Sequence, residues 1–103
     1  MLEFFKRLLG GNEAEMQQIK QIVADGAVVI DVRSQGEFRR GNINGSKNIP
    51  VDDIGAHVKK IEAMKKPIVL CCASGMRSAR AASILKANGV PEVYDAGSWI
   101  NLQ

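Results

Sequence analysis

The sequence contains few cysteine, proline, histidine or aromatic residues. Its 103 positions include two cysteines, three prolines, one histidine and five aromatic residues. Two cysteines and one histidine are too few to form a four-ligand zinc site of Cys and His side chains. No run rich in lysine and arginine is interleaved with aromatic residues, and the net charge is only +3, so we expect no nucleic-acid binding.

Long hydrophobic runs are also absent. No stretch approaches the roughly 20 apolar residues that span a bilayer, so we expect no stable membrane insertion. Residues 1–9 are largely apolar, but three charged side chains interrupt them, whereas a secretory signal has an unbroken apolar region of about 7–15 residues. We therefore expect a cytoplasmic protein. Residues 1–12 would be a helical extension or tail that packs on the domain, contacts a second copy or anchors weakly to a membrane surface.

The remaining residues, 13–103, have the composition of one ordinary globular domain, with 46% hydrophobic and 24% charged residues over the whole chain. Helical and strand patterns alternate along them. Helical spacing predicts helices over residues 13–24, from about 54 to 64, and over 78–88. Apolar runs predict strands over residues 27–32, 68–71 and 92–94. This alternation predicts an α/β fold with a mostly parallel sheet covered by helices.

Chemically active side chains follow two of the predicted strands. Asp31 and Arg33 end the first strand, and Cys71 and Cys72 end the second. In open α/β sheets, ligands bind beyond the carboxyl ends of the strands. Neighbouring residues of a strand point to opposite faces, so a disulfide between the two cysteines would be strained. Each cysteine is therefore expected to serve in core packing or in chemistry.

Residues 72–78 join the second long strand to a helix. In such a loop the backbone N–H groups can point into one bowl, at which the following helix directs the positive end of its dipole. Gly75 permits the tight curve, and Arg77 supplies a cation at the start of the helix. A thiol at a helix N-terminus beside arginine commonly has a lowered pKa. We therefore predict that Cys72 is held as an anionic sulfur.

The motif Cys72-x-x-Gly75-x-Arg77-Ser78 resembles the active-site loop of the rhodanese family. Further segments are similar to the family pattern in the same order, namely Asp31-x-Arg33, Glu37-Phe38, Gly41-Asn-Ile-Asn-Gly-Ser46, Asn48-Ile49-Pro50 and Ala96-Gly-Ser-Trp99. The resemblance covers roughly residues 19–99. Asn42 stands where the family usually has histidine, and Ser98 replaces the second glycine of a Gly-Gly-Trp element.

The resemblance implies a rhodanese-like fold, with four or five strands flanked by helices on both faces. It also implies a sulfurtransferase that carries sulfur as a persulfide on Cys72. Thiosulfate or another sulfane-sulfur donor would load the cysteine, and cyanide, a small thiol or a protein thiol would accept the sulfur. The residues implied to bind substrate and stabilise the persulfide are Ala73, Ser74, Gly75, Met76, Arg77 and Ser78, with Asp31 and Arg33 in support. No metal or organic cofactor is implied.

Two other functions compete with this one. Five residues separate Cys71 from Arg77, which is the spacing of the protein-tyrosine-phosphatase signature. We favour sulfur chemistry because Leu70, not histidine, precedes Cys71, and because Cys71 completes an apolar strand. The second alternative is a persulfide carrier or binding module that serves a protein partner.

Several residues also have simple structural interpretations. Cys71 fills the core in the favoured interpretation and acts as a resolving thiol in the other. Asp31, at the end of an apolar strand, requires a partner, and both Arg33 and Arg77 are candidates.

Other polar residues are expected to lie at the surface or at the edge of the core. Glu37, Arg39 and Arg40 are predicted to form a solvated face, and His57 to be an exposed helical residue. Trp99 is expected to cover the pocket or to close the core.

Overall fold

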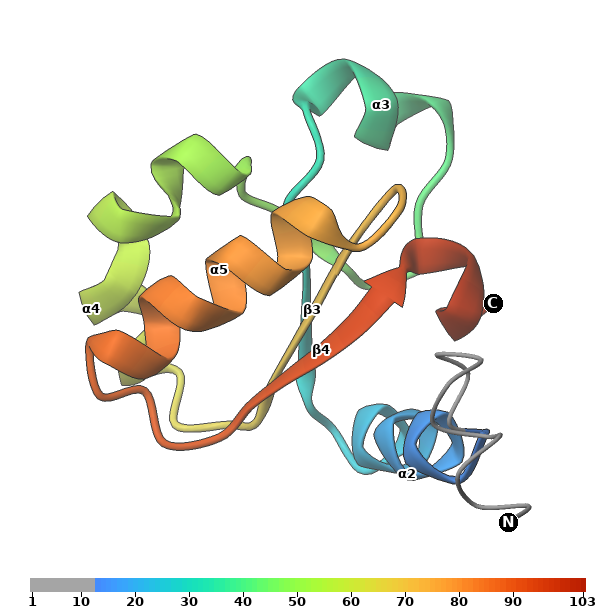
Figure 1. The fold of residues 1–103 in the computed structure, drawn as a ribbon, viewed down its shortest axis with the longest axis horizontal. Helices are drawn as coiled ribbons and strands as arrows, with labels where there is room; N and C mark the ends of the chain where they lie inside the picture. The colour runs from blue at the N-terminus through green and yellow to red at the C-terminus, as the bar shows by residue number, and fades with distance from the viewer. Residues whose placement is uncertain (1–12) are drawn as a thin grey trace, which may run out of the picture.

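A computed structural model describes residues 13–103, which form a four-stranded parallel sheet with helices on both faces (Figure 1). The strands lie in the order β2-β1-β3-β4. Their bounds are β1 Val28–Asp31, β2 Lys47–Asn48, β3 Ile68–Cys72 and β4 Val93–Ser98. The prediction of a parallel, helix-covered α/β sheet is confirmed, with four strands in the described part of the chain.

Two layers of helix cover the sheet. The elements are α2 Glu13–Ala24, α3 Gln35–Arg40, α4 Val58–Ala63, α5 Met76–Ala87, and the 3-10 helices η1 Val51–His57 and η2 Trp99–Leu102. Side chains of η1, α4 and α5 pack into one core cluster, and those of α2 and η2 pack into a second cluster on the other face. Helix α2 has the predicted bounds.

Strand β3 passes between these two cores and is buried along its whole length. Successive side chains of a strand alternate between the faces of a sheet. Leu70 and Cys72 accordingly lie in the cluster beneath α5, whereas Val69 and Cys71 lie in the cluster beneath α2. The structure therefore separates the adjacent cysteines as the strand pattern predicts.

The middle helix differs from its prediction. The chain enters it at Val51 as 3-10 helix and becomes α-helix only at Val58. Val51 and Ile54 are both buried and three residues apart, which matches the period of a 3-10 helix.

Helix α5, Met76–Ala87, begins two residues earlier than predicted, and its buried face differs in part from the prediction. The prediction that Ala79 faces the sheet is wrong, because Ala79 is exposed while Ser78, Ala81 and Ala82 are buried. Ala82 and Leu85 do face the core, as predicted.

The predicted extension over residues 1–12 lies outside the described residues. Among residues 13–103, no helix combines the length and the apolar character needed to cross a membrane.

Candidate active site

The candidate active site lies at the carboxyl end of the sheet. The loop between β3 and α5, helix α3 and helix η2 all gather at this end (Figure 1). Cys72 is the last residue of β3 and pairs with Ser98 of β4 after a register shift that follows Leu70. The convergence of strand ends brings together residues that are distant in sequence.

Cys72 is enclosed by its own loop. The residue is 0% exposed, and its sulfur accepts a hydrogen bond from the Gly75 backbone N–H at 2.9 Å. The Ser78 hydroxyl lies 3.5 Å from the same sulfur and donates to the Gly75 carbonyl at 3.0 Å. The start of α5 is thus folded around the thiol.

Gly75 makes this fold possible because it adopts a left-handed backbone conformation, with φ of +112°. L-residues with a side chain rarely adopt this conformation. A Cβ at this position would lie 3.7 Å from the Gly97 Cα, which is ordinary contact. Backbone conformation, more than space, therefore favours glycine here.

The pKa values of the two cysteine thiols are shifted in opposite directions. Burial raises the pKa of the Cys72 thiol, but hydrogen bonds from Ser78, Gly75 and Ser74 outweigh burial and leave the pKa below its ordinary value. Burial is also the largest influence on Cys71, where the opposing attraction of Arg33 is too small to offset it, and the pKa of that thiol rises to about 12. Cys72 is therefore the better candidate for a thiolate at neutral pH, and the prediction that Cys71 fills the core is confirmed.

Asp31 and Arg33 form a buried ion pair at the end of β1. Arg33 Nη2 lies 2.7 Å from Asp31 Oδ2, and Arg33 Nε donates to both carboxylate oxygens. The same guanidinium donates to the Gly41 carbonyl at 2.7 Å and lies 4.6 Å from the centroid of the Trp99 ring. Of the two predicted partners of Asp31, the structure therefore selects Arg33. Trp99 both covers this pair and packs against the core beneath α2.

Arg77 is engaged by a different carboxylate. Its Nη1 and Nη2 atoms donate to Glu37 Oε1 and Oε2 at 2.7 and 3.0 Å. This contact pulls the pKa of Glu37 down to about 2. The prediction that Glu37 belongs to a solvated face is wrong, because its side chain ties α3 to the start of α5. Arg39 and Arg40 are exposed, as predicted.

The sequence around Glu37 carries a signal for the start of helix α3. Ser34 and Glu37 form a capping box: the Ser34 hydroxyl accepts from the Glu37 N–H, and the Glu37 carboxylate accepts from the Ser34 N–H. A serine followed three residues later by glutamate is typical of a helix start. It indicates α3, although it does not indicate that Glu37 also reaches Arg77.

The other predicted loop residues form the rim of the site. Ala73, Ser74 and Met76 are exposed, and Met76 is 83% exposed. His57 is half-buried, whereas it was expected to be exposed, and its Nδ1 lies 2.9 Å from the Asp53 carbonyl oxygen. Within residues 13–103, no three His, Cys, Asp or Glu side chains gather in a way that would hold a metal ion.

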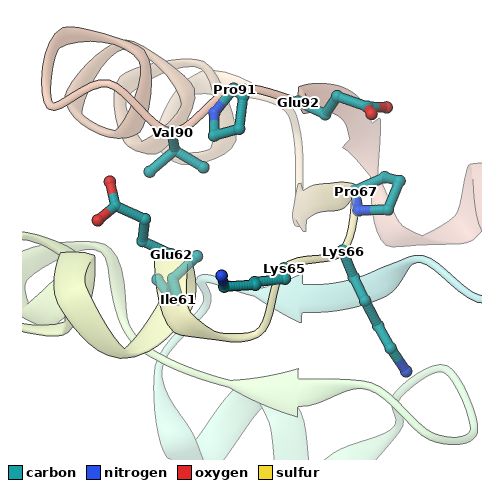
Figure 2. Close-up of a pocket in the computed structure, with 8 residues that line it drawn as sticks. All are labelled: Ile61, Glu62, Lys65, Lys66, Pro67, Val90, Pro91 and Glu92. Atoms are coloured by element: carbon teal, nitrogen blue, oxygen red, sulfur yellow. The ribbon is translucent and has the colours of Figure 1, made fainter.

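A separate groove of about 380 Å³ lies at the other end of the sheet (Figure 2). It is lined by the residues that precede β3 and β4, including Glu62, Lys66 and Pro91. None of the predicted site residues lines it. The groove is therefore separate from Cys72 and its loop.

The fold and the site together define an α/β domain in which a cysteine with a lowered pKa ends a central strand and is enclosed by the loop that leads to the next helix. The family profile of the rhodanese-like domain matches residues 15–99. The chain belongs to the rhodanese-like domain family.

Several relatives show the same relationship. The chain is 31% identical over 86 residues to the thiosulfate sulfurtransferase GlpE of Ectopseudomonas mendocina, an alignment that covers 84% of this chain and 78% of that protein. It is 41% identical over 69 residues to the uncharacterized protein YqhL of Bacillus subtilis, where the alignment covers 67% of this chain and 54% of that protein. The structure of the human single-domain sulfurtransferase TSTD1 superposes with a TM-score of 0.69 at 26% identity, covering 82% of this chain and 88% of that one. The rhodanese-like fold inferred from the sequence motifs is thus confirmed.

Proposed function

We propose that this protein is a sulfurtransferase that moves a sulfane sulfur from thiosulfate or a similar donor to a thiophilic acceptor through a persulfide on Cys72. The acceptor would be cyanide, a small thiol or a protein thiol. The proposal includes a cytoplasmic location, where thiols remain reduced. The observation that carries it is the hydrogen bonding at Cys72, which lowers the pKa of a thiol placed at the end of β3, just before the loop that leads to α5.

The loading step would proceed by attack of the Cys72 thiolate on the outer sulfur of the donor. With thiosulfate, the bond between the two donor sulfurs breaks, its electron pair leaves with sulfite, and a new S–S bond forms at Cys72. An acceptor thiolate or cyanide then attacks the outer sulfur of the persulfide and releases the Cys72 thiolate. The two half-reactions share one covalent intermediate and would give ping-pong kinetics.

Three observations at the two cysteines support this chemistry. The Gly75 N–H already contacts the sulfur, and the neighbouring N–H groups at the start of α5 are available to stabilise an anionic persulfide. The Ser78 hydroxyl can turn toward a thiolate when the thiol loses its proton, because its single hydrogen rotates freely. Cys71 lacks these contacts, since it lies in the opposite core with a raised pKa. That difference favours the sulfur-transfer hypothesis over the phosphatase hypothesis, which requires Cys71.

The test is a measurement of intact mass after incubation with thiosulfate and removal of the donor. Wild type and Cys71→Ser are expected to gain the mass of one sulfur atom, and Cys72→Ser is expected to gain none. Addition of cyanide should remove the extra sulfur and yield thiocyanate. Sulfur on Cys71 alone would overturn the proposed site, and loading that discharges only to a protein thiol would indicate the carrier function.

A further inference from the structure

A second groove, of about 430 Å³, lies between the edge strand β2 and helix α4. Its lining includes three residues at β2 and three at the junction and end of α4, which are Lys47, Asn48, Ile49, His57, Lys60 and Met64. Strand β1 separates β2 from β3, the strand that ends at Cys72. No residue of the Cys72 loop lines this groove, so it lies outside the candidate active site.

The charges that line this groove are of one sign. Lys47 and Lys60 are exposed, and none of the described residues that line the groove is acidic. Neither lysine takes part in the three ion pairs of residues 13–103. The groove of Figure 2 differs, because two glutamates lie beside its two lysines and balance their charge. The groove beside β2 therefore favours an acidic ligand, and the groove of Figure 2 does not.

The backbone of β2 is open along the same groove. Asp31 of β1 lies opposite Asn48, and the Ile49 N–H donates to the Asp31 carbonyl at 3.0 Å. In parallel pairing, a residue that bonds to both neighbours of its opposite residue leaves that opposite residue with its N–H and C=O directed away. No other strand of residues 13–103 lies beyond β2. Asn48 therefore presents one donor and one acceptor to a further extended chain.

Side-chain contacts hold this edge in place. The Asn48 side-chain amide donates to the carbonyls of Asp31 and Arg33, at 3.0 and 2.9 Å, and so fixes β2 against β1. Ile49 is buried in the core cluster beneath α5. A binding surface that is already ordered loses little conformational entropy when a ligand arrives. The two backbone groups of Asn48 are thus positioned before binding.

Charge decides which chain can pair with this edge. A second copy paired through its own β2 would bring the lysines of two grooves together, and like charges on neighbouring strands are destabilising. A segment with acidic residues at alternate positions has its carboxylates on one face, because successive side chains of a strand point to opposite faces. Such a segment can direct these carboxylates toward Lys47 and Lys60 while its backbone bonds to Asn48.

We propose that the groove between β2 and α4 binds an extended acidic segment of a partner protein. The segment adds a strand to the sheet at Asn48 and pairs its carboxylates with Lys47 and Lys60. In this mode of recognition, main-chain hydrogen bonds supply affinity and alternate side chains supply specificity. The site is separate from Cys72, and the proposal does not depend on sulfur transfer.

The test is a titration of the isotope-labelled full chain with the peptide acetyl-Glu-Val-Glu-Val-Glu-amide, followed by two-dimensional NMR. The Asn48 amide proton is expected to shift downfield as it gains a hydrogen-bond acceptor, and the other large changes should map to β2 and α4. Higher salt should weaken binding, because the lysines are exposed. The same peptide with glutamine in place of glutamate should bind about fivefold more weakly.

Two variants and one small anion separate the contributions of charge and backbone. Lys60→Glu is expected to weaken binding at least about tenfold, because it places a like charge against the peptide. Lys66→Glu, at the groove of Figure 2, makes the same change in net charge and should leave the affinity within about twofold of wild type. Citrate carries three carboxylates but no peptide backbone, and it should bind at least about tenfold more weakly than the peptide.

Each contrary result overturns a stated part of the proposal. Equal weakening by Lys60→Glu and Lys66→Glu would show attraction to net charge alone. Citrate that binds as tightly as the peptide, or an Asn48 amide signal that does not move, would overturn strand addition. No binding of the peptide at millimolar concentration would overturn the docking site. Failure of Cys72 to gain sulfur bears only on the proposed function and leaves this result unaffected.

Discussion

The backbone N–H of Gly75 lies 2.9 Å from the sulfur of Cys72, three residues earlier in the chain. This contact exists because Gly75 adopts a φ of +112°, which turns the chain back over the end of β3 before α5 begins. One backbone conformation thus links the start of a helix to the acidity of a thiol.

Replacement of Gly75 by alanine should disturb the site without a steric clash. The added Cβ would meet only ordinary contact, but the left-handed conformation costs an L-residue about 1–2 kcal/mol. We expect Gly75→Ala to lower the free energy of unfolding by about that amount and to slow persulfide formation at neutral pH. Denaturant unfolding and intact-mass loading measure the two effects.

Gly36→Ala in α3 is the matched control, because its Cβ would meet nothing within 4 Å and its φ is not positive. It is expected to leave loading unchanged and to preserve or raise stability. Equal effects of the two substitutions would show that the conformation of Gly75 is unimportant.

The two thiols should differ in their pH dependence of alkylation. Hydrogen bonds at Cys72 outweigh burial and leave its pKa below the ordinary value, whereas burial raises the pKa of Cys71 to about 12. Since the thiolate is the reactive form, iodoacetamide labelling is expected at Cys72 from neutral pH and at Cys71 only after unfolding. Peptide mapping of labelled protein across pH 5–10 provides the measurement, and preferential labelling of folded Cys71 would contradict it.

Ser78→Ala should raise the pKa of Cys72. The substitution removes the hydroxyl beside the sulfur and leaves the Gly75 carbonyl without that donor. We expect the alkylation midpoint of Cys72 to move to higher pH and the free energy of unfolding to fall by about 1 kcal/mol. Ser83→Ala, on the exposed part of α5, is the control and should change neither quantity.

Asp31→Asn should destabilise the fold strongly. The substitution leaves Arg33, which is 5% exposed, with its charge uncompensated between Gly41 and Trp99. Removing one partner of a buried ion pair costs about 3–5 kcal/mol. Denaturant unfolding of Asp31→Asn should therefore show a loss of that order.

Asp52→Asn provides the comparison, because both side chains of the Asp52–Arg80 ion pair are exposed to solvent. Exposed pairs contribute about 0–1 kcal/mol, so this variant should unfold almost as wild type does. A similar loss in both variants would indicate that burial does not distinguish the two pairs.

The sequence predicted most of the fold because its signals were periodic or continuous. The spacing of apolar residues indicated α2, and the unbroken apolar run from Ile68 to Cys71 indicated the strand that carries the site. The loop motif that follows Cys72 indicated the candidate nucleophile and a helix start with Gly75 and Arg77. These features depend on residues close together in the chain.

The features that the sequence did not predict depend on distance in the chain or on short elements. Strand β2 has only two residues, which is too short for a hydrophobic pattern. Glu37 and Arg77 are forty positions apart, and nothing local to either residue indicates that they meet. The alternatives for Asp31 were resolved only when the folded chain placed Arg33 against the carboxylate and Arg77 against Glu37.

The alternation of side chains along β3 has a chemical consequence for the two adjacent cysteines. A free thiol beside a persulfide can attack its inner sulfur, form a disulfide and expel hydrogen sulfide, which would destroy the stored sulfur. Here Cys71 belongs to the core beneath α2 and Cys72 to the core beneath α5, with the backbone of the strand between their side chains. The sheet thus separates the two neighbouring thiols, and the proposed persulfide on Cys72 would be protected from attack by Cys71.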